Sequence, residues 1–200
     1  MEDIYSKTYV DLLTTDQGGI DAFIKKYDSL DHVTRFEIVE LLRIAAVDEW
    51  LASYNYYASE AHSKTDGKAD FDPEFHAHAG EELKHFEDLN MRLREMNQEP
   101  LVFPMQSFIS MNSSGAAWKQ EMNSGDSVEI LKRRLDEEKG AVKFYSLVLR
   151  VIKRLEDETG EYDSTTETLV KKIKADEEQH ERELRELLVQ HDGKYSEVVA

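Results

Sequence analysis

DEEQHEREL occupies residues 176–184 of the chain, and EELKHFEDL occupies residues 81–89. Each stretch has a glutamate followed three positions later by a histidine: Glu82 and His85 in one, Glu177 and His180 in the other. Positions three apart lie on the same face of a helix, so each pair can direct a carboxylate and an imidazole at one point. All four residues fall on the apolar stripe of a helical pattern, which predicts that they face the core of a helical bundle.

Two further glutamates fall on apolar stripes of other predicted helices. Glu49 opens EWLASYNYYASEA, residues 49–61, and Glu138 belongs to the run Asp136-Glu-Glu-Lys139. Both begin the same pattern, in which an alanine follows after three residues and a tyrosine after seven: Glu49, Ala52 and Tyr56; Glu138, Ala141 and Tyr145. Two interpretations of the tyrosines stay open: they hydrogen-bond the carboxylates that bind metal, or they are core residues whose hydroxyls are satisfied elsewhere.

The third helix offers Glu137 as an alternative to Glu138. We favour Glu138 because Leu131 and Leu135 then share its face. Choosing Glu137 would instead turn Arg133 or Arg134 inward one turn earlier.

The pattern predicts an all-α fold with two helical hairpins. The expected segments are an N-terminal arm over 1–30 with a short helix over 20–27, four long helices over 32–62, 72–97, 126–158 and 163–191, and a tail over 193–200. Asp31 is the predicted N-cap of the first long helix, and residues 63–70 form a polar turn. The long connection over 98–125 indicates a crossover that spans a bundle formed by 31–192.

Composition limits the classes of function. The chain has no cysteine, so thiolate metal sites, iron–sulfur clusters and disulfides are excluded. Its formal net charge of −17 attracts cations and disfavours direct DNA binding. No signal segment or membrane span is indicated, so the expected location is the cytoplasm.

Four carboxylates in one core would repel one another unless positive charge lay between them. One glutamate from each of two helices, with Glu-x-x-His from the other two, is the pattern of dinuclear carboxylate bundles. Oxygen and imidazole ligands suit iron, with manganese or zinc possible. The sequence therefore predicts a dinuclear metal site, and its proposed ligands are Glu49, Glu82, His85, Glu138, Glu177 and His180.

EWLASYNYYASEA, EELKHFEDL and DEEQHEREL resemble the corresponding segments of bacterioferritins and, more loosely, rubrerythrins and archaeal-type Dps-like proteins. The resemblance implies a ferritin-like bundle whose dinuclear iron site oxidises Fe(II) with O₂ or H₂O₂. It also implies a homo-oligomeric cage, with a 12-mer favoured over a 24-mer, for iron storage and oxidative-stress protection. Leu83 stands where bacterioferritins have their haem-binding methionine, so no haem is expected.

Two other functions remain open from sequence. One is a non-storing di-iron or di-manganese peroxidase or catalase of rubrerythrin type, although Ala141 stands where rubrerythrins carry an extra glutamate. The other is a structural ferritin-like shell protein. His78 could serve an additional ion, but a hydrogen-bonded or exposed histidine is the expectation there.

Overall fold

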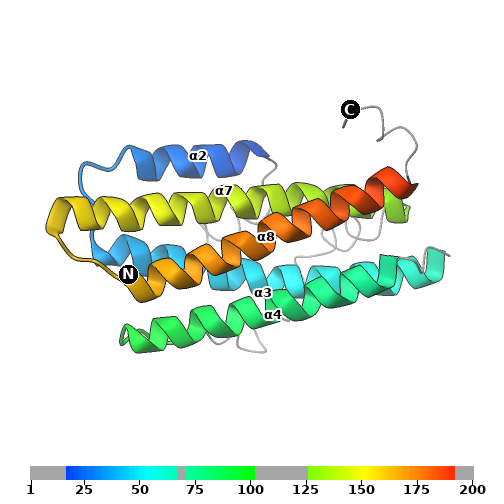
Figure 1. Cartoon of the computed structure of the whole chain (residues 1–200), viewed down its shortest axis with the longest axis horizontal. Coiled ribbons are helices and arrows are strands. Elements are labelled where there is room, and N and C mark those ends of the chain that lie inside the picture. The colour runs from blue at the N-terminus through cyan, green and yellow to red at the C-terminus, as the bar shows by residue number, and fades with distance from the viewer. Residues whose placement is uncertain (1–16, 67–70, 102–125, 192–200) are drawn as a thin grey trace, which may run out of the picture.

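Figure 1 shows a computed structural model of the chain, which describes residues 17–66, 71–101 and 126–191. These ranges hold no strand and five α-helices: α2 (Gln17–Asp28), α3 (Arg35–Asp66), α4 (Asp72–Glu95), α7 (Ser127–Thr159) and α8 (Ser164–His191). The predicted all-α fold is confirmed. Within the described ranges, no helix combines the length and the hydropathy that crossing a membrane requires.

The four long helices form two hairpins, in which α3 packs against α4 and α7 against α8. In Figure 1, α4 ends at the left of the bundle and α7 begins at its right, so these two helices run in the same direction. The chain must therefore cover the length of the bundle between them, as expected of a crossover. Residues 102–125, which make most of this connection, lie outside the described residues.

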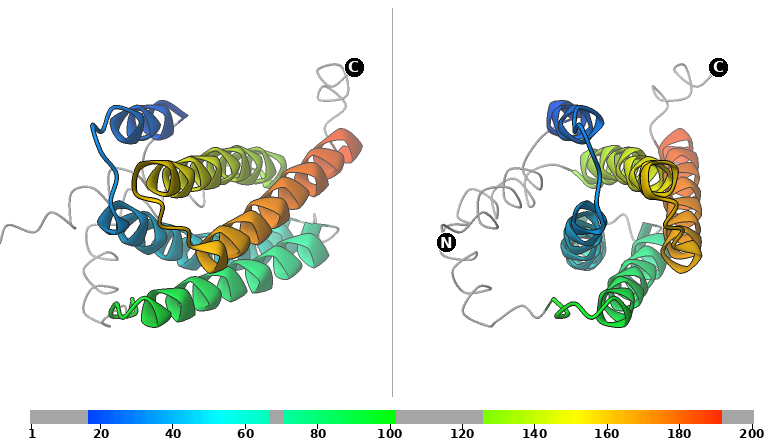
Figure 2. Two further views of the ribbon diagram at one scale, coloured as in Figure 1. Left: turned by 60° about the vertical axis from the view of Figure 1, so that its left-hand side comes forward. Right: turned by 90° about the vertical axis from the view of Figure 1, so that its left-hand side faces the viewer.

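The N-terminal arm contributes to the core. Its helix, α2, lies outside the four long helices and beside α7, as the end-on view in Figure 2 shows. Phe23 and Tyr27 of α2 are buried, and the ring of Phe23 stacks on that of Phe144. The helix is longer than predicted, because it begins at Gln17 rather than near residue 20.

The start of α3 corrects the sequence prediction. The helix begins at Arg35, and Asp31 is not its cap. Thr34 takes that position: the side chain of Glu37 accepts from the Thr34 N–H at 2.6 Å, and Thr34 Oγ1 accepts from the Phe36 N–H at 3.2 Å. This is a capping box, which fixes the first turn three residues later than predicted. The helix also continues to Asp66, into the predicted turn.

The other helix ends depend on local capping. Helix α4 stops at Glu95, two residues early, because Asn97 adopts a left-handed φ of 58°. Asp126 caps α7, whose last residue is Thr159, and its side chain accepts from the Glu129 N–H at 3.0 Å. Asp163 caps α8 through the Thr166 N–H at 3.0 Å. Asp126 and Asp163 are thus the N-caps of α7 and α8.

Apolar side chains fill the bundle in two separate clusters. One includes Leu42, Leu89, Val148 and Ile173. The other includes Phe75, Leu131, Leu184 and Leu188. On every long helix, the positions between these two clusters hold the predicted metal ligands, so a polar layer crosses the middle of an otherwise apolar core.

Gly140 inside α7 and Gly160 at its C-terminal cap allow the capping role of Gly160 to be tested. Gly160 ends α7 with a φ of +76°, while Gly140 lies inside the helix, and a Cβ at either position would meet nothing within 4 Å. Backbone conformation alone should therefore separate the two. We expect Gly160→Ala to lower the free energy of unfolding by about 1 kcal/mol, and Gly140→Ala to raise it by a similar amount. Chemical denaturation measures both, and equal effects of the two substitutions would contradict the capping role of Gly160.

Candidate metal centre

Six polar side chains meet at mid-height of the bundle, although each comes from a face that is otherwise apolar. They are Glu49 from α3, Glu82 and His85 from α4, Glu138 from α7, and Glu177 and His180 from α8, here called the six-residue cluster. None is more than 4% exposed. The structure thus brings together all six residues that the sequence predicted as ligands.

The six-residue cluster contains two overlapping groups of potential ligands: Glu49, Glu82, His85 and Glu177 in one, and Glu82, Glu138, Glu177 and His180 in the other. Within each group the candidate ligand atoms lie within 4.8 Å of one another. Glu82 and Glu177 belong to both groups, so these carboxylates could bridge two ions. Each group adds one glutamate and one histidine of its own.

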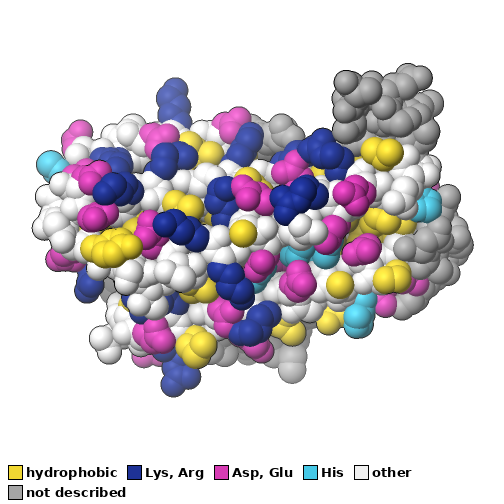
Figure 3. Space-filling view, viewed as in Figure 1, with side chains coloured by type: hydrophobic (Ala, Val, Ile, Leu, Met, Phe, Trp, Pro, Cys, Tyr) yellow, Lys and Arg dark blue, Asp and Glu magenta, His cyan; other side chains and the backbone are white. Residues whose placement is uncertain are grey.

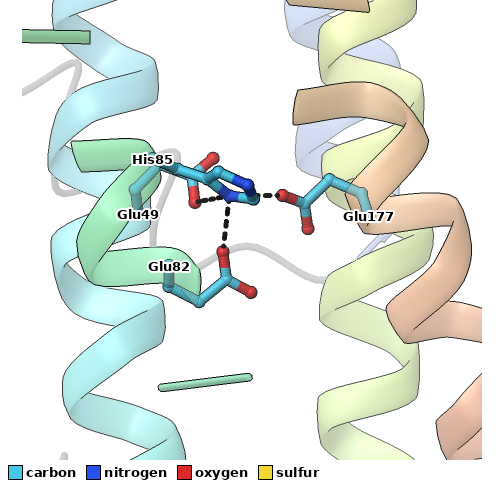
Figure 4. A group of neighbouring side chains, drawn as sticks. All are labelled: Glu49, Glu82, His85 and Glu177. Carbon is cyan, nitrogen blue, oxygen red and sulfur yellow. Dashed lines mark hydrogen bonds and ion pairs between the residues drawn. The ribbon is translucent and has the colours of Figure 1, made fainter. Parts of the chain in front are cut away.

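A histidine Nδ1 atom marks the middle of each group. His85 Nδ1 lies 3.2 Å from Glu49 Oε2, 3.1 Å from Glu82 Oε2 and 3.2 Å from Glu177 Oε1, as Figure 4 shows. His180 Nδ1 lies 3.1 Å from Glu82 Oε1 and 3.7 Å from an oxygen of each of Glu138 and Glu177. The two halves of the cluster are therefore related by an approximate two-fold symmetry, as the sequence repeat predicts.

The two predicted tyrosines contact the cluster across the bundle. Tyr145 on α7 donates its hydroxyl proton to Glu49 Oε1, and Tyr56 on α3 donates to Glu138 Oε1. Both tyrosines are buried. Each hydrogen bond engages one oxygen of its glutamate and leaves the other, Oε2, facing a histidine Nδ1. The tyrosines thus orient the two carboxylates that belong to only one group.

Two carboxylates at the surface of the bundle, the exposed Glu81 and the partly exposed Asp176, hold the outer side of the imidazoles. Asp176 Oδ2 lies 3.1 Å from His85 Nε2, and Glu81 Oε2 lies 2.7 Å from His180 Nε2. An Nε2–H donated to a carboxylate leaves Nδ1 as the lone-pair nitrogen that faces inward. Sequence reasoning missed these two residues, although a signal was present: each directly precedes a shared glutamate, Glu82 or Glu177.

Burial makes negative charge costly in this cluster. Burial, with the charges of Glu177 and Glu82, raises the pKa of Glu49 well above its ordinary value. Burial, with the charges of Glu82 and Glu138, raises the pKa of Glu177 to about 8. Burial would also raise the pKa of Glu82, but hydrogen bonds with His180 and His85 lower it instead.

The histidines show the opposite response to the same field. Burial alone would lower the pKa of His85 and of His180, but hydrogen bonds with the surrounding glutamates raise both far above the ordinary value. The cluster therefore favours positive charge at the two points where the Nδ1 atoms lie. A divalent cation supplies that charge more fully than a proton does.

The unsatisfied atoms of the cluster fit a dinuclear metal site. Among the described residues, no hydrogen bond of normal geometry reaches Glu82 Oε1, Glu177 Oε1 or His180 Nδ1, although all three are buried. These atoms face one another or His85 Nδ1 at 3.1–3.2 Å without a well-formed hydrogen bond, which is rare for buried polar atoms in native proteins and indicates an absent water or ion. The charge of two divalent cations would also balance that of four ionised glutamates. The donor atoms, their geometry and their charge therefore all fit a dinuclear metal site.

The two acidic candidates on α7 are separated by the structure. Glu138 is 3% exposed and belongs to the cluster, whereas the Glu137 side chain is 50% exposed and pairs with Arg134 Nη1 at 2.6 Å. Of the two expectations behind the choice of Glu138, inward-facing leucines are confirmed, whereas an outward-facing Arg134 is wrong. Leu131 and Leu135 are buried as expected, but Arg134 is buried as well.

His78 is hydrogen-bonded, as expected, because its Nε2 lies 2.9 Å from Glu183 Oε2. Its side chain is nevertheless only 1% exposed, and its Nδ1 has no hydrogen-bond partner among the described residues.

Comparisons with known proteins agree with this architecture. A dodecameric thioferritin, the bacterioferritin-related protein from Bacteroides fragilis, has a solved structure similar to this chain, with a TM-score of 0.64. The two sequences are 23% identical, and the match covers 90% of this chain and 99% of that one, which shows a shared fold. No curated protein sequence matches the chain.

The family assignment rests on sequence. Residues 39–192 match the Ferritin family, described as a ferritin-like domain. The match includes all four long helices from the fifth residue of α3 onward, with every member of the six-residue cluster. The chain therefore belongs to the ferritin-like family.

Proposed function

We propose that the six-residue cluster is a ferroxidase centre, which binds two Fe(II) ions as substrate and oxidises them with O₂ or H₂O₂. The observation that carries the proposal is the pair of overlapping buried ligand groups that share Glu82 and Glu177. Two Fe(II) ions give up two electrons, which together with two protons reduce O₂ to H₂O₂ or H₂O₂ to water. Manganese or zinc would fit the same oxygen and imidazole donors.

Each residue has a distinct part in this proposal. Glu82 and Glu177 bridge the two ions, while Glu49 with His85 and Glu138 with His180 complete one ion each. The hydrogen bonds from Tyr145 and Tyr56 hold the terminal glutamates in place. Asp176 and Glu81 hold the imidazoles with Nδ1 inward. The chain thus supplies a rigid, water-poor site before any ion arrives, which reduces the reorganisation that oxidation requires.

We further propose that the chain assembles into a homo-oligomeric cage of bacterioferritin-related type, most simply a 12-mer, that stores the oxidised iron. The structural similarity to a dodecameric protein along nearly its whole length supports this assembly. The acidic composition, with a formal net charge of −17, supports a surface that concentrates incoming cations.

Anaerobic Fe(II) titration followed by addition of oxidant tests the proposed function. The expected result is tight binding of about two Fe(II) per chain, one in each ligand group of the six-residue cluster, then oxidation and continued uptake of iron into a particle of high mass. Saturation at two ions with rapid peroxide turnover in a dimer or tetramer would instead favour the non-storing peroxidase. If no Fe(II) bound at the cluster, the result would favour a structural ferritin-like shell protein.

A matched pair of substitutions on α7 checks the ligand set. Glu138→Gln should lower the Fe(II) stoichiometry from about two to about one per chain, because the amide cannot replace the charged ligand of one ion. Glu137→Gln changes the adjacent, half-exposed residue and should keep both ions. Isothermal titration under anaerobic conditions measures both, and loss of an ion from the Glu137 variant alone would show that the assignment is wrong.

The pKa shifts predict that metal binding releases protons. Near neutral pH, Glu177 is mostly protonated because its pKa lies at about 8, and both histidines carry raised pKa values. Metal ligation requires ionised carboxylates and free imidazole nitrogens, so protons must leave, and affinity should rise with pH between about 6 and 8. Titration with Mn²⁺ in two buffers of different ionisation enthalpy measures the release.

The release should be smaller at about pH 9, where Glu177 is already ionised. Glu178→Gln serves as the control, because Glu178 is partly exposed and pairs with Lys174 outside the cluster. Binding that released no protons near neutral pH would contradict the assignment of these groups as ligands.

A further inference from the structure

A third set of potential ligands lies outside the six-residue cluster. Glu74 and His78 are one turn apart on α4, and Glu183 faces them from α8, with candidate ligand atoms within 4.8 Å of one another. This set shares no residue with the six-residue cluster. Both glutamates are partly exposed, and the Glu183 side chain is 33% exposed, so solvent reaches this set more readily than the buried cluster.

His78 indicates that this set is more than a pair of surface acids. Its side chain is 1% exposed, and one ring nitrogen lies close to both carboxylates. Nε2 is 2.9 Å from Glu183 Oε2, while Nδ1 has no hydrogen-bond partner among the described residues. Nε2 is therefore the ring nitrogen that this set offers to an ion.

The surroundings hold the ring of His78 in place. It stacks on the ring of His180 with centroids 4.1 Å apart, and it meets the ring of Tyr56 edge-on at 5.1 Å. A ring fixed on two sides presents its nitrogen to the carboxylates with little loss of conformational freedom. Figure 3 shows the region from outside, where histidine side chains are bordered by acidic ones along the seam between α4 and α8.

We propose that Glu74, His78 and Glu183 form a third, mononuclear site for a divalent transition-metal ion. One imidazole and two carboxylates suit Fe²⁺, Mn²⁺ or Zn²⁺. Three protein ligands, against four in each group of the six-residue cluster, leave at least one coordination position for water, so an ion here binds more weakly than the two in the cluster and remains exchangeable. Because His78 contacts the His180 ring, an ion here lies next to the six-residue cluster on its more exposed side. Metal binding at this site does not depend on whether the six-residue cluster is a ferroxidase centre.

Titration with Co²⁺ alone, in about 0.15 M salt to screen weak surface binding, tests this site. The wild-type chain should bind three Co²⁺, and His78→Ala and Glu183→Gln should each bind two. His76→Ala is the matched control, because His76 is the neighbouring exposed histidine that pairs with Glu60, and it should keep all three. Proton NMR of the Co²⁺-loaded protein should show three sets of shifted imidazole signals, of which His78→Ala loses one.

Glu183→Gln keeps the test meaningful if His78→Ala fails to fold, since Glu183 is partly exposed and its replacement is nearly isosteric. A wild-type stoichiometry of two that neither variant changes would overturn the proposal. So would a third ion that survives in both variants. If the wild-type chain bound only one Co²⁺ and both variants bound none, this site would be supported and the ferroxidase centre contradicted.

Discussion

The burial of four glutamates between the same four helices is the constraint on which the rest of the structure depends. Ionised carboxylates at this depth repel one another and lose their hydration, so the bundle needs compensating positive charge at its centre. The raised pKa values of Glu49 and Glu177, and those of the two histidines, are consequences of that requirement. Two divalent cations would satisfy it with neutral imidazoles and fully ionised carboxylates.

The surrounding fold isolates this charged layer and keeps it rigid. Apolar clusters close the bundle above and below it, which excludes water and strengthens every electrostatic interaction inside. The polar contacts cross between the two hairpins in matched pairs: Tyr145 reaches Glu49 while Tyr56 reaches Glu138, and Asp176 reaches His85 while Glu81 reaches His180. Each half of the site is therefore oriented by residues of the other half, so the site forms only when both hairpins are packed together.

Much of this could be predicted from the sequence, because a helix places residues by a fixed period. The Glu-x-x-His spacing and the apolar stripes were enough to predict all six residues of the cluster and the all-α fold. Features that depend on how helices approach one another could not be predicted in this way. The burial of Arg134 and the approach of Glu183 to His78 both depend on how neighbouring helices are rotated and how far apart they lie. The helical period of the sequence carries no information on either. The later start of α3, capped at Thr34, was missed for another reason: Asp31 also fits an N-cap, and only the hydrogen bonds decide between them.

Anomalous scattering from crystals of the iron-loaded protein, measured at the iron absorption edge, tests the central claim most directly. We expect two peaks inside the six-residue cluster, about 3.5–4 Å apart, with Glu82 and Glu177 in contact with both and one histidine beside each. A single peak there, or iron found only outside the cluster, would contradict the account.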